Sequence, residues 1–174
     1  RRGVATRVPD CDRLFTFSRL FYVGRRYLQR YGRLMPVRMA EPPAIMHWTY
    51  PVPVRLLGAR NVYTIHDLVP LRLPYLSLED KSYHERLLRA CISSGDHVLT
   101  VSESSRSDIL TYLEVPAEKV TTIHQAVTGL PGLAAVEEAD RRRLRALFDL
   151  EPQGYFLFYG ATEPKKNVGR LIEG

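Results

Sequence analysis

The sequence predicts an α/β protein built on a doubly wound parallel sheet. Short runs of β-branched and apolar residues, bounded by Pro and Gly, recur along the chain as buried parallel strands do. Between them lie longer segments whose apolar residues repeat at helical spacing. In such folds ligands bind at the carboxyl ends of the strands. With 45% hydrophobic and 25% charged residues among 174, the chain can bury a core.

The chain begins with a strongly basic segment. Residues 1–40 hold ten Arg against two Asp, a net charge of +8, whereas the whole chain carries +6. The apolar spacing predicts an amphipathic helix within residues 14–31, with Arg side chains between the apolar positions. Such a helix usually packs its apolar stripe against a core. Peripheral contact of residues 12–31 with an anionic membrane surface is the alternative.

Two buried parallel strands are expected next, over residues 44–48 and 61–65. A helix should then begin at Ser77, because this side chain can cap it with Asp80 three residues later. Gly95 should end this helix. Its inward face is expected to carry Tyr83, Leu87, Ala90 and Cys91.

The alternation of strands and helices continues to residue 123. Residues 97–101 and 119–123 are expected to be strands. Between them, Ser102 should cap a helix. The inward residues of that helix are expected to be Ile109, Leu110 and Leu113.

A Gly- and Pro-rich stretch without periodicity predicts a linker at residues 128–136, which separates a lobe of residues 1–127 from a second of residues 137–174. In the second lobe, residues 137–150 are expected to be helical and residues 155–159 to form a wholly apolar buried strand. The helix should carry Leu144, Leu147 and Phe148 on one side.

The turn after the 155–159 strand has the features of an anion-binding loop. Gly160 permits close approach of the backbone, and Lys165 and Lys166 add positive charge. Asn167 can cap the following helix, whose free N–H groups would receive a phosphate. The alternative is a solvated Lys pair that binds nothing. The spacing differs from that of a Walker loop, which disfavours ATP hydrolysis.

A second candidate site is the pair His66 and Asp67, directly after the 61–65 strand. This position is the sheet edge where ligands gather, and Pro70 shapes the loop. A structural histidine at the end of a strand is the alternative interpretation.

The chain closely resembles family 4 of the retaining glycosyltransferases in four segments that occur in the family's order: VYTIHDLVPLRLP, DHVLTVSESSRSDIL, EVPAEKVTTIHQAV and YFLFYGATEPKKNVGRLIEG. The resemblance runs from about His47 to Gly174. It is closest to bacterial enzymes that build cell-surface polysaccharide, many of them mannosyltransferases. It implies a GT-B fold of two Rossmann-like lobes, with the acceptor on the N-terminal lobe and the sugar-nucleotide mainly on the C-terminal lobe.

The resemblance also implies roles for individual residues. His66 matches the catalytic histidine that approaches the donor sugar and its diphosphate. Lys166 matches the basic residue that neutralises the departing diphosphate, and Lys165 stands where the family usually has Arg. Gly160 is a further diphosphate contact. Contacts to the donor sugar, or a loop-shaping role, are expected of Asp67, Glu163 and Asn167.

The chain also departs from the family. Gln125-Ala126-Val127 replaces the usual Asn-Gly-Val, and Ala161 stands where some members place a phosphate-binding Arg. The family's Glu-x7-Glu motif would lie beyond Gly174. The 174 residues are therefore expected to be an inactive fragment of a transferase.

No cofactor is expected, because the nucleotide-sugar is a substrate, and fixed cations can stabilise the leaving diphosphate without a metal. Asp10-Cys11-Asp12 has the DxD spacing of a metal site but follows no strand, so no metal site is expected. The Arg-rich start lacks the signatures of nucleic-acid-binding folds, so nucleic acid is not expected as a partner.

Neither a disulfide framework nor a membrane span is predicted, which favours a cytoplasmic protein, with peripheral attachment to the inner face of the membrane as the alternative. The predicted function is transfer of a sugar, with retention, from GDP-mannose or a similar nucleotide-sugar to a glycan or lipid-linked acceptor. The alternative is a non-catalytic remnant or a module that docks on membrane or on another subunit.

Overall fold

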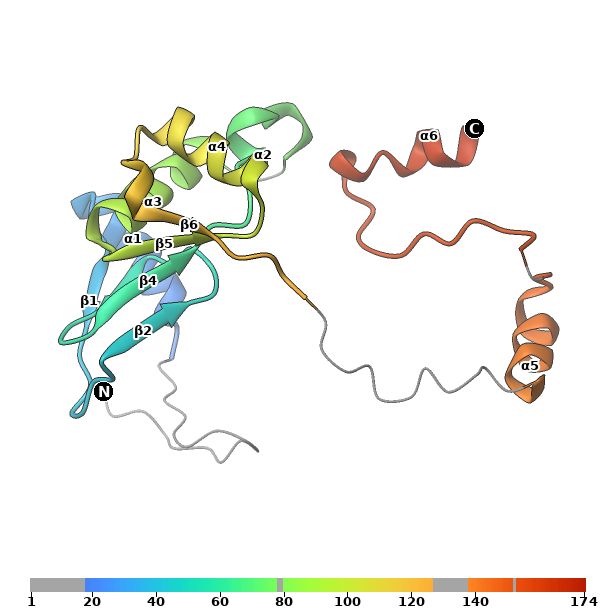
Figure 1. Cartoon of the computed structure of the whole chain (residues 1–174), viewed down its shortest axis with the longest axis horizontal. Helices are drawn as coiled ribbons and strands as arrows, with labels where there is room; N and C mark the ends of the chain where they lie inside the picture. Colours follow the sequence, from blue (N-terminus) through green and yellow to red (C-terminus); the bar gives the residue numbers. More distant parts are fainter. Residues whose placement is uncertain (1–17, 78–79, 127–137, 152) are drawn as a thin grey trace. The chain divides into compact units, whose positions relative to one another are not determined.

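The computed structural model describes residues 18–77, 80–126, 138–151 and 153–174 (Figure 1). The chain divides into two units, Arg1–His124 and Gln125–Gly174. The predicted linker at residues 128–136 lies outside the described residues, so the predicted lobe boundaries stay predictions.

The first unit is built on a four-stranded parallel sheet with the order β2-β4-β5-β6. The register aligns Trp48 with Tyr63, Tyr63 with Val98 and Val98 with Val120. The strands are β2 (Ile45–Trp48), β4 (Arg60–Thr64), β5 (His97–Thr100) and β6 (Val120–Thr122), each within or one residue outside its predicted range. The predicted parallel sheet is therefore confirmed.

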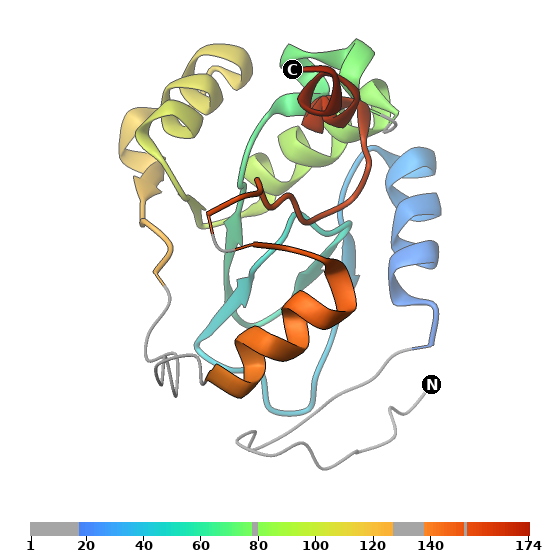
Figure 2. The ribbon, with the colours of Figure 1, turned by 90° about the vertical axis from the view of Figure 1, so that its right-hand side faces the viewer.

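A second, two-stranded parallel sheet pairs β1 (Met35–Val37) with β3 (Val54–Leu56). The sequence analysis missed both strands, because three residues are too few to show a period. Helix α1 (Leu20–Tyr31) packs beside β1, as Figure 2 shows.

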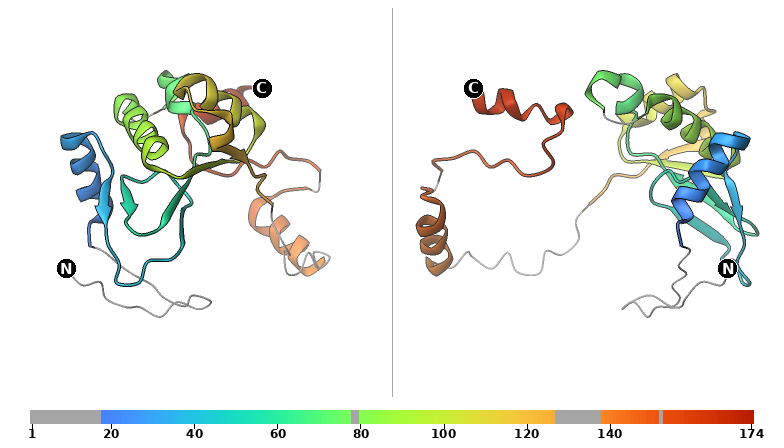
Figure 3. Two further views of the ribbon diagram at one scale, coloured as in Figure 1. Left: turned by 60° about the vertical axis from the view of Figure 1, so that its left-hand side comes forward. Right: turned by 180° about the vertical axis from the view of Figure 1, so that it is seen from behind.

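The helices of the first unit cover one face of the four-stranded sheet. On that face, Tyr63 packs in one cluster with Leu28 of α1 and Leu87 of α3 (Lys81–Ser94). Val98, on the same face, packs in a second cluster with Ile109 of α4 (Glu103–Leu113). Figure 3 shows α3 and α4 on the same side of the strands. Among the described residues, the fold is thus Rossmann-like, with helices on one of the two faces that a doubly wound sheet covers.

Short helical segments connect these elements. They are α2 (Val69–Arg72) and the 3-10 helices η1 (Pro74–Leu76) and η2 (Ala117–Lys119). None of the helices in the described part of the chain is both long enough and apolar enough to cross a membrane.

The start of α3 differs from the prediction. Asp80, not Ser77, is the N-cap, and its carboxylate accepts a hydrogen bond from the N–H of Tyr83 at 3.1 Å. Asp80 still has an extended backbone, so the helix cannot have begun before it. A carboxylate at this position also interacts favourably with the helix dipole, which a serine hydroxyl does not. The end at Gly95 and the buried face with Leu87, Ala90 and Cys91 are confirmed.

Helix α4 follows the prediction closely. The Ser102 hydroxyl accepts from the N–H of Ser105 at 3.1 Å, as an N-cap should. Ile109 and Leu113 are buried, and Leu110 packs at the border of the same cluster. Local capping and periodicity therefore agree with the tertiary packing here.

Strand β2 is less buried than predicted. It is one of the two edge strands of the four-stranded sheet, and Ile45 at its start is 60% exposed. An apolar run cannot by itself distinguish an edge strand from a central one, because that difference depends on which strands pair.

Asn61 is a fully buried polar residue at the start of β4, and it joins four segments. Its carboxamide bonds both backbone groups of Leu56 at 2.8 and 2.9 Å. The same group donates to the carbonyl of Ala59 and accepts from Nε1 of Trp48. The backbone N–H of Asn61 donates to Asp96. Every polar atom of the buried Asn61 carboxamide therefore has a hydrogen-bond partner.

Cys91 of α3 is buried in the core, and its Sγ lies 3.6 Å from the carbonyl of Val52, in the segment before β3. Burial raises the pKa of Cys91 to about 12. Burial likewise raises the pKa of Tyr63, whose hydroxyl donates to the carbonyl of Val54 at 2.8 Å. Both groups are held neutral in the folded protein.

We therefore expect the free energy of unfolding to fall as pH rises above 9, the ordinary pKa of this thiol. The unfolded chain then loses the Cys91 proton while the folded chain keeps it, which favours unfolding by about 1 kcal/mol at pH 10. Urea unfolding at pH 8 and pH 10 measures this, and Cys91→Ala should reduce the difference. Equal pH dependence in the variant and the original chain would contradict the expectation.

The second unit contains α5 (Glu138–Phe148), the 3-10 helix η3 (Pro164–Lys166) and α6 (Val168–Glu173). The predicted strand over residues 155–159 is wrong: this segment has no strand, and the Phe156 ring is fully exposed. A strand exists only when neighbours complete its hydrogen bonds, and the described residues of this unit provide none. The apolar side chains of α5 that were expected to face inward are also exposed, namely Leu144, Leu147 and Phe148.

Candidate functional site

The carboxyl edge of the four-stranded sheet carries the first candidate site. Directly after β4, Ile65 continues the pairing, with its N–H donating to the carbonyl of Leu99 at 2.8 Å. His66 follows and is half-buried. Its backbone carbonyl accepts from the hydroxyl of Ser105 at 2.8 Å. Ser105, near the start of α4, therefore fixes the backbone at His66. Among the described residues, none forms a hydrogen bond with the His66 imidazole.

Asp67 is exposed and shapes the loop that leaves His66. Its Oδ1 accepts from the N–H of Val69 at 2.9 Å, which is an Asx turn that leads into α2. At the other end of α2, Arg72 makes an ion pair with Asp108 of α4 at 2.9 Å. The segment after β4 is thus tied to α4 at two places, through His66 and through Arg72.

The loops after β5 and β6 join the same edge. His124 Nδ1 lies 3.2 Å from the carbonyl of Val101, and the N–H of Ile123 donates to the carbonyl of Thr100 at 2.8 Å. The ends of β4, β5 and β6 are therefore cross-linked by hydrogen bonds. This arrangement gives the edge a fixed shape to which a ligand could bind.

Two hydroxyl groups at this edge were missed by the sequence analysis. Thr100 and Thr122 are the last residues of β5 and β6 and are paired in register. The Oγ1 atoms of both are buried and have no hydrogen-bond partner within the described part of the chain. Buried hydroxyls without partners are uncommon in folded proteins. No sequence pattern marks them, because Thr at the end of a strand is ordinary.

The second candidate site lies in the unit of residues 125–174. Gly160 has a φ of 130°, a backbone conformation that favours glycine, and a Cβ placed there would meet no neighbour. Lys165 and Lys166 end the 3-10 helix η3. Lys165 Nζ makes an ion pair with Oε2 of Glu163 at 2.9 Å. Glu163 and Lys165 therefore partly neutralise each other in this conformation.

The predicted cap at Asn167 is correct in position but not in chemistry. Asn167 is the N-cap residue of α6, yet its side chain makes no capping hydrogen bond. Its backbone is left-handed, with φ 50°, because it also ends η3. A residue whose side chain caps a helix usually has an extended backbone, and Asn167 does not.

The predicted site residues therefore fall into two groups. His66 and Asp67 belong to the first unit, and Gly160, Glu163, Lys165, Lys166 and Asn167 belong to the second. Within the described residues, His, Cys, Asp and Glu side chains form no group of three that could hold a metal ion. The DxD spacing at residues 10–12 lies outside the described residues.

Residues 4–128 match the family model of glycosyltransferase family 4. The O-antigen chain mannosyltransferase B of Escherichia coli is 30% identical over 115 residues, which are 66% of this chain and 30% of that protein. The O-antigen chain mannosyltransferase RfbU of Salmonella typhimurium is 29% identical over 110 residues, 63% of this chain and 27% of that protein. The serotype-specific mannosyltransferase WbdA of Escherichia coli is 23% identical over 181 residues, 91% of this chain and 22% of that protein.

The chain thus spans less than a third of the length of each of these relatives. No solved structure matches it at a significant level.

Proposed function

The chain belongs to glycosyltransferase family 4, and from this premise we propose that the full-length protein transfers a sugar from a nucleotide-sugar to a glycan or lipid-linked acceptor. The similarity to three O-antigen or serotype-specific mannosyltransferases favours GDP-mannose as the donor and cell-surface polysaccharide as the product. The position of His66 at the carboxyl edge of the sheet, with its backbone fixed by Ser105, is the structural observation that supports this proposal.

In the proposed reaction, the glycosyl–phosphate bond breaks and negative charge builds on the leaving diphosphate. The acceptor hydroxyl forms the new bond to the anomeric carbon on the same face and gives its proton to the leaving diphosphate, so the configuration is retained. His66 would contact the donor sugar and its diphosphate from the sheet edge. Lys166 and the backbone at Gly160 would stabilise the leaving group by fixed charge and N–H donors, with no metal or cofactor required.

A transfer assay with the full-length protein tests this proposal. GDP-mannose, and UDP- and ADP-sugars for comparison, are incubated with an acceptor that ends in mannose, and the products are analysed by mass spectrometry. The proposal expects an acceptor heavier by one hexose with GDP-mannose. If none of these donors supports transfer to the acceptor, the proposal is contradicted.

The alternative proposal, a docking module, is supported by the outer surface of α1. Tyr22, Val23 and Tyr31 are 57%, 47% and 59% exposed there, beside exposed Arg26 and Arg30. Helix α1 contains no acidic residue. Of the predicted apolar stripe, Leu28 is buried and Leu20 packs against the same cluster, whereas Phe21 and Tyr31 are 61% and 59% exposed. Aromatic and basic side chains together suit an anionic membrane surface.

We expect the protein to bind vesicles that contain anionic lipid and not neutral vesicles. The double charge reversal Arg26→Glu and Arg30→Glu should weaken binding more than tenfold, because each basic residue near an anionic surface contributes about 1 kcal/mol. Cosedimentation with vesicles measures this, with Arg86→Glu on the exposed side of α3 as the matched control. Equal binding of both variants would contradict membrane contact through α1.

A further inference from the structure

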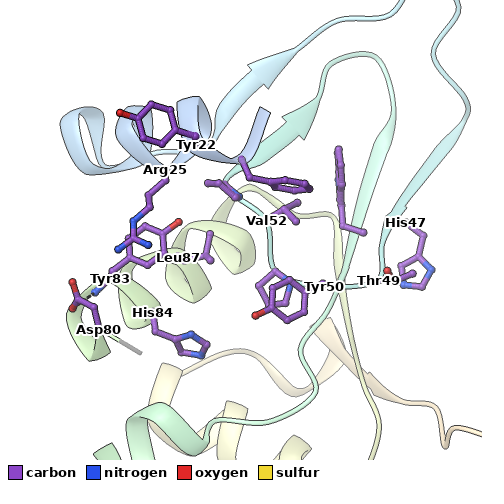
Figure 4. Close-up of a pocket in the computed structure, with 14 residues that line it drawn as sticks. Tyr22, Arg25, His47, Thr49, Tyr50, Val52, Asp80, Tyr83, His84 and Leu87 are labelled. Atoms are coloured by element: carbon purple, nitrogen blue, oxygen red, sulfur yellow. Dashed lines mark hydrogen bonds between the residues drawn. The ribbon is translucent and has the colours of Figure 1, made fainter. Parts of the chain in front are cut away.

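A pocket of about 920 Å³ lies between α1, α3 and the chain segment that follows β2. All of it belongs to the first unit. Its volume is in the upper part of the range for small-molecule sites, about 300–1,000 Å³. Figure 4 shows side chains from α1, from the end of β2 and from α3 around this space. None of the residues predicted as site residues lines it.

Aromatic rings form much of the pocket wall. Phe21 and Tyr22 of α1 are 61% and 57% exposed, and Tyr50, after β2, is 57% exposed. Trp48 also lines the pocket and stacks on the buried Tyr63 ring, with ring centroids 6.3 Å apart. The rings offer flat apolar faces, and the tyrosines add hydroxyl groups at their tips. Such a wall suits a ligand that has both C–H faces and polar edges.

Polar groups stand between these rings. Arg25 reaches from α1 over the Tyr83 ring, with 4.2 Å between its Cζ and the ring centroid (Figure 4). Asp80, at the start of α3, faces the same space. His47 borders the pocket at the end of β2, but its Nε2 lies 2.8 Å from Oγ1 of Thr64, on the opposite face of the sheet. The pocket therefore provides a hydrogen-bond donor on α1 and an acceptor at the start of α3.

The charges in the pocket disfavour a diphosphate. Among the described residues that line it, Arg25 and Asp80 are the only ones with a permanent charge, and these two balance. The N-terminus of α3, where an anion would otherwise bind, is already occupied by the Asp80 carboxylate. A second anion there would be repelled. The chemistry favours a neutral ligand rich in hydroxyl groups.

The pocket also lies next to β4, the strand that His66 follows. Trp48 of β2 is paired in register with Tyr63 of β4, and neighbouring strands lie about 4.8 Å apart. Tyr50 follows Trp48 by two residues, and His66 follows Tyr63 by three. The two loops therefore leave the same sheet edge from adjacent strands.

We propose that this pocket binds the terminal sugar rings of the acceptor, an inference that rests on the proposed function. The exposed rings of Phe21, Tyr22 and Tyr50 stack on the C–H faces of a hexose. Arg25 and Asp80 bond its hydroxyl groups. The acceptor class is thus a neutral glycan end rather than a phosphate-bearing group.

Trp48 is the one tryptophan of the 174-residue chain, so its fluorescence reports directly on this pocket. We expect α-mannobiose to change that fluorescence in a saturable manner, and to receive saturation from the protein in ligand-observed NMR. Tyr50→Ala and Phe21→Ala should each raise the Kd at least tenfold. The matched control Tyr75→Ala removes a tyrosine that is 77% exposed outside the pocket, and it should leave the Kd unchanged.

The proposal is overturned if neither measurement detects mannobiose, if pyrophosphate displaces it, or if Tyr75→Ala weakens binding as much as Tyr50→Ala. Circular dichroism of each variant shows that the fold is retained. The binding test requires no donor and no turnover, so it separates the pocket from the proposed reaction. If the full-length enzyme transfers sugar and Tyr50→Ala leaves its KM for the acceptor unchanged, the pocket assignment fails and the proposed function stands.

Discussion

Replacing Asn61 with alanine should lower the free energy of unfolding by about 3–5 kcal/mol, the largest stability effect that we expect of any single substitution. The alanine would leave the backbone groups of Leu56 and the Nε1 of Trp48 without their present partner. These groups surround a side chain with no exposed surface, so water cannot easily replace it. Urea unfolding measures the change.

Two further variants serve as a control and as a partial loss of the Asn61 hydrogen bonds. Gln29→Ala removes an exposed amide on α1 and should change stability by less than about 0.5 kcal/mol. Trp48→Phe removes only one of the bonds to Asn61 and should have an intermediate effect. A loss of less than about 1 kcal/mol for Asn61→Ala would mean that the carboxamide does not organise the packing between β2, β3 and β4.

Replacing His66 with alanine in the full-length enzyme should lower turnover about 10²–10³-fold, the range expected when one transition-state contact is removed. Stability should change little. Ser105 bonds the backbone carbonyl of His66, not its imidazole, and alanine keeps that carbonyl. Steady-state kinetics with thermal unfolding of the same sample separates the two effects.

The matched control is His97→Ala. This histidine lies at the start of β5, at the opposite end of the strand from the proposed site, and its Nε2 lies 2.9 Å from Oγ1 of Thr121. It should lower turnover no more than about twofold. Equal turnover in His66→Ala and in the unsubstituted enzyme would remove His66 from the proposed mechanism and leave it a structural residue.

The sequence predicted those elements whose signals are local. Ser102 caps α4 because the capping bond spans only three residues, and the periodic Ile109 and Leu113 then fall on the buried side. The start of α3 was wrong because Ser77 and Asp80 are both good capping residues, and the backbone around them decided between the two.

Elements that depend on distant partners could not be predicted in this way. The apolar segment 155–159 has the composition of a buried strand, but no strand among the described residues pairs with it. Asn61 has no special signal in the sequence, because its partners at Trp48, Leu56 and Asp96 are brought together only by the fold. The aromatic pocket could not be predicted either, because its walls come from three segments that only the fold brings together.

The candidate site was predicted in position more than in geometry. His66 was expected at the carboxyl edge of a strand, and it lies there. The Asx turn of Asp67 and the ion pair between Glu163 and Lys165 required the structure. The catalytic and donor-binding roles of these residues stay predictions.

Real-time NMR of the full-length enzyme with GDP-mannose labelled with ¹³C at the anomeric carbon tests the central claim most directly. The account predicts that the donor signal decays while the signal of an α-linked mannoside grows on the acceptor, with no β-linked product at early times. A β-linked first product would contradict retention. Release of free mannose without transfer, or an unchanged donor, would contradict assignment of the protein as a sugar transferase.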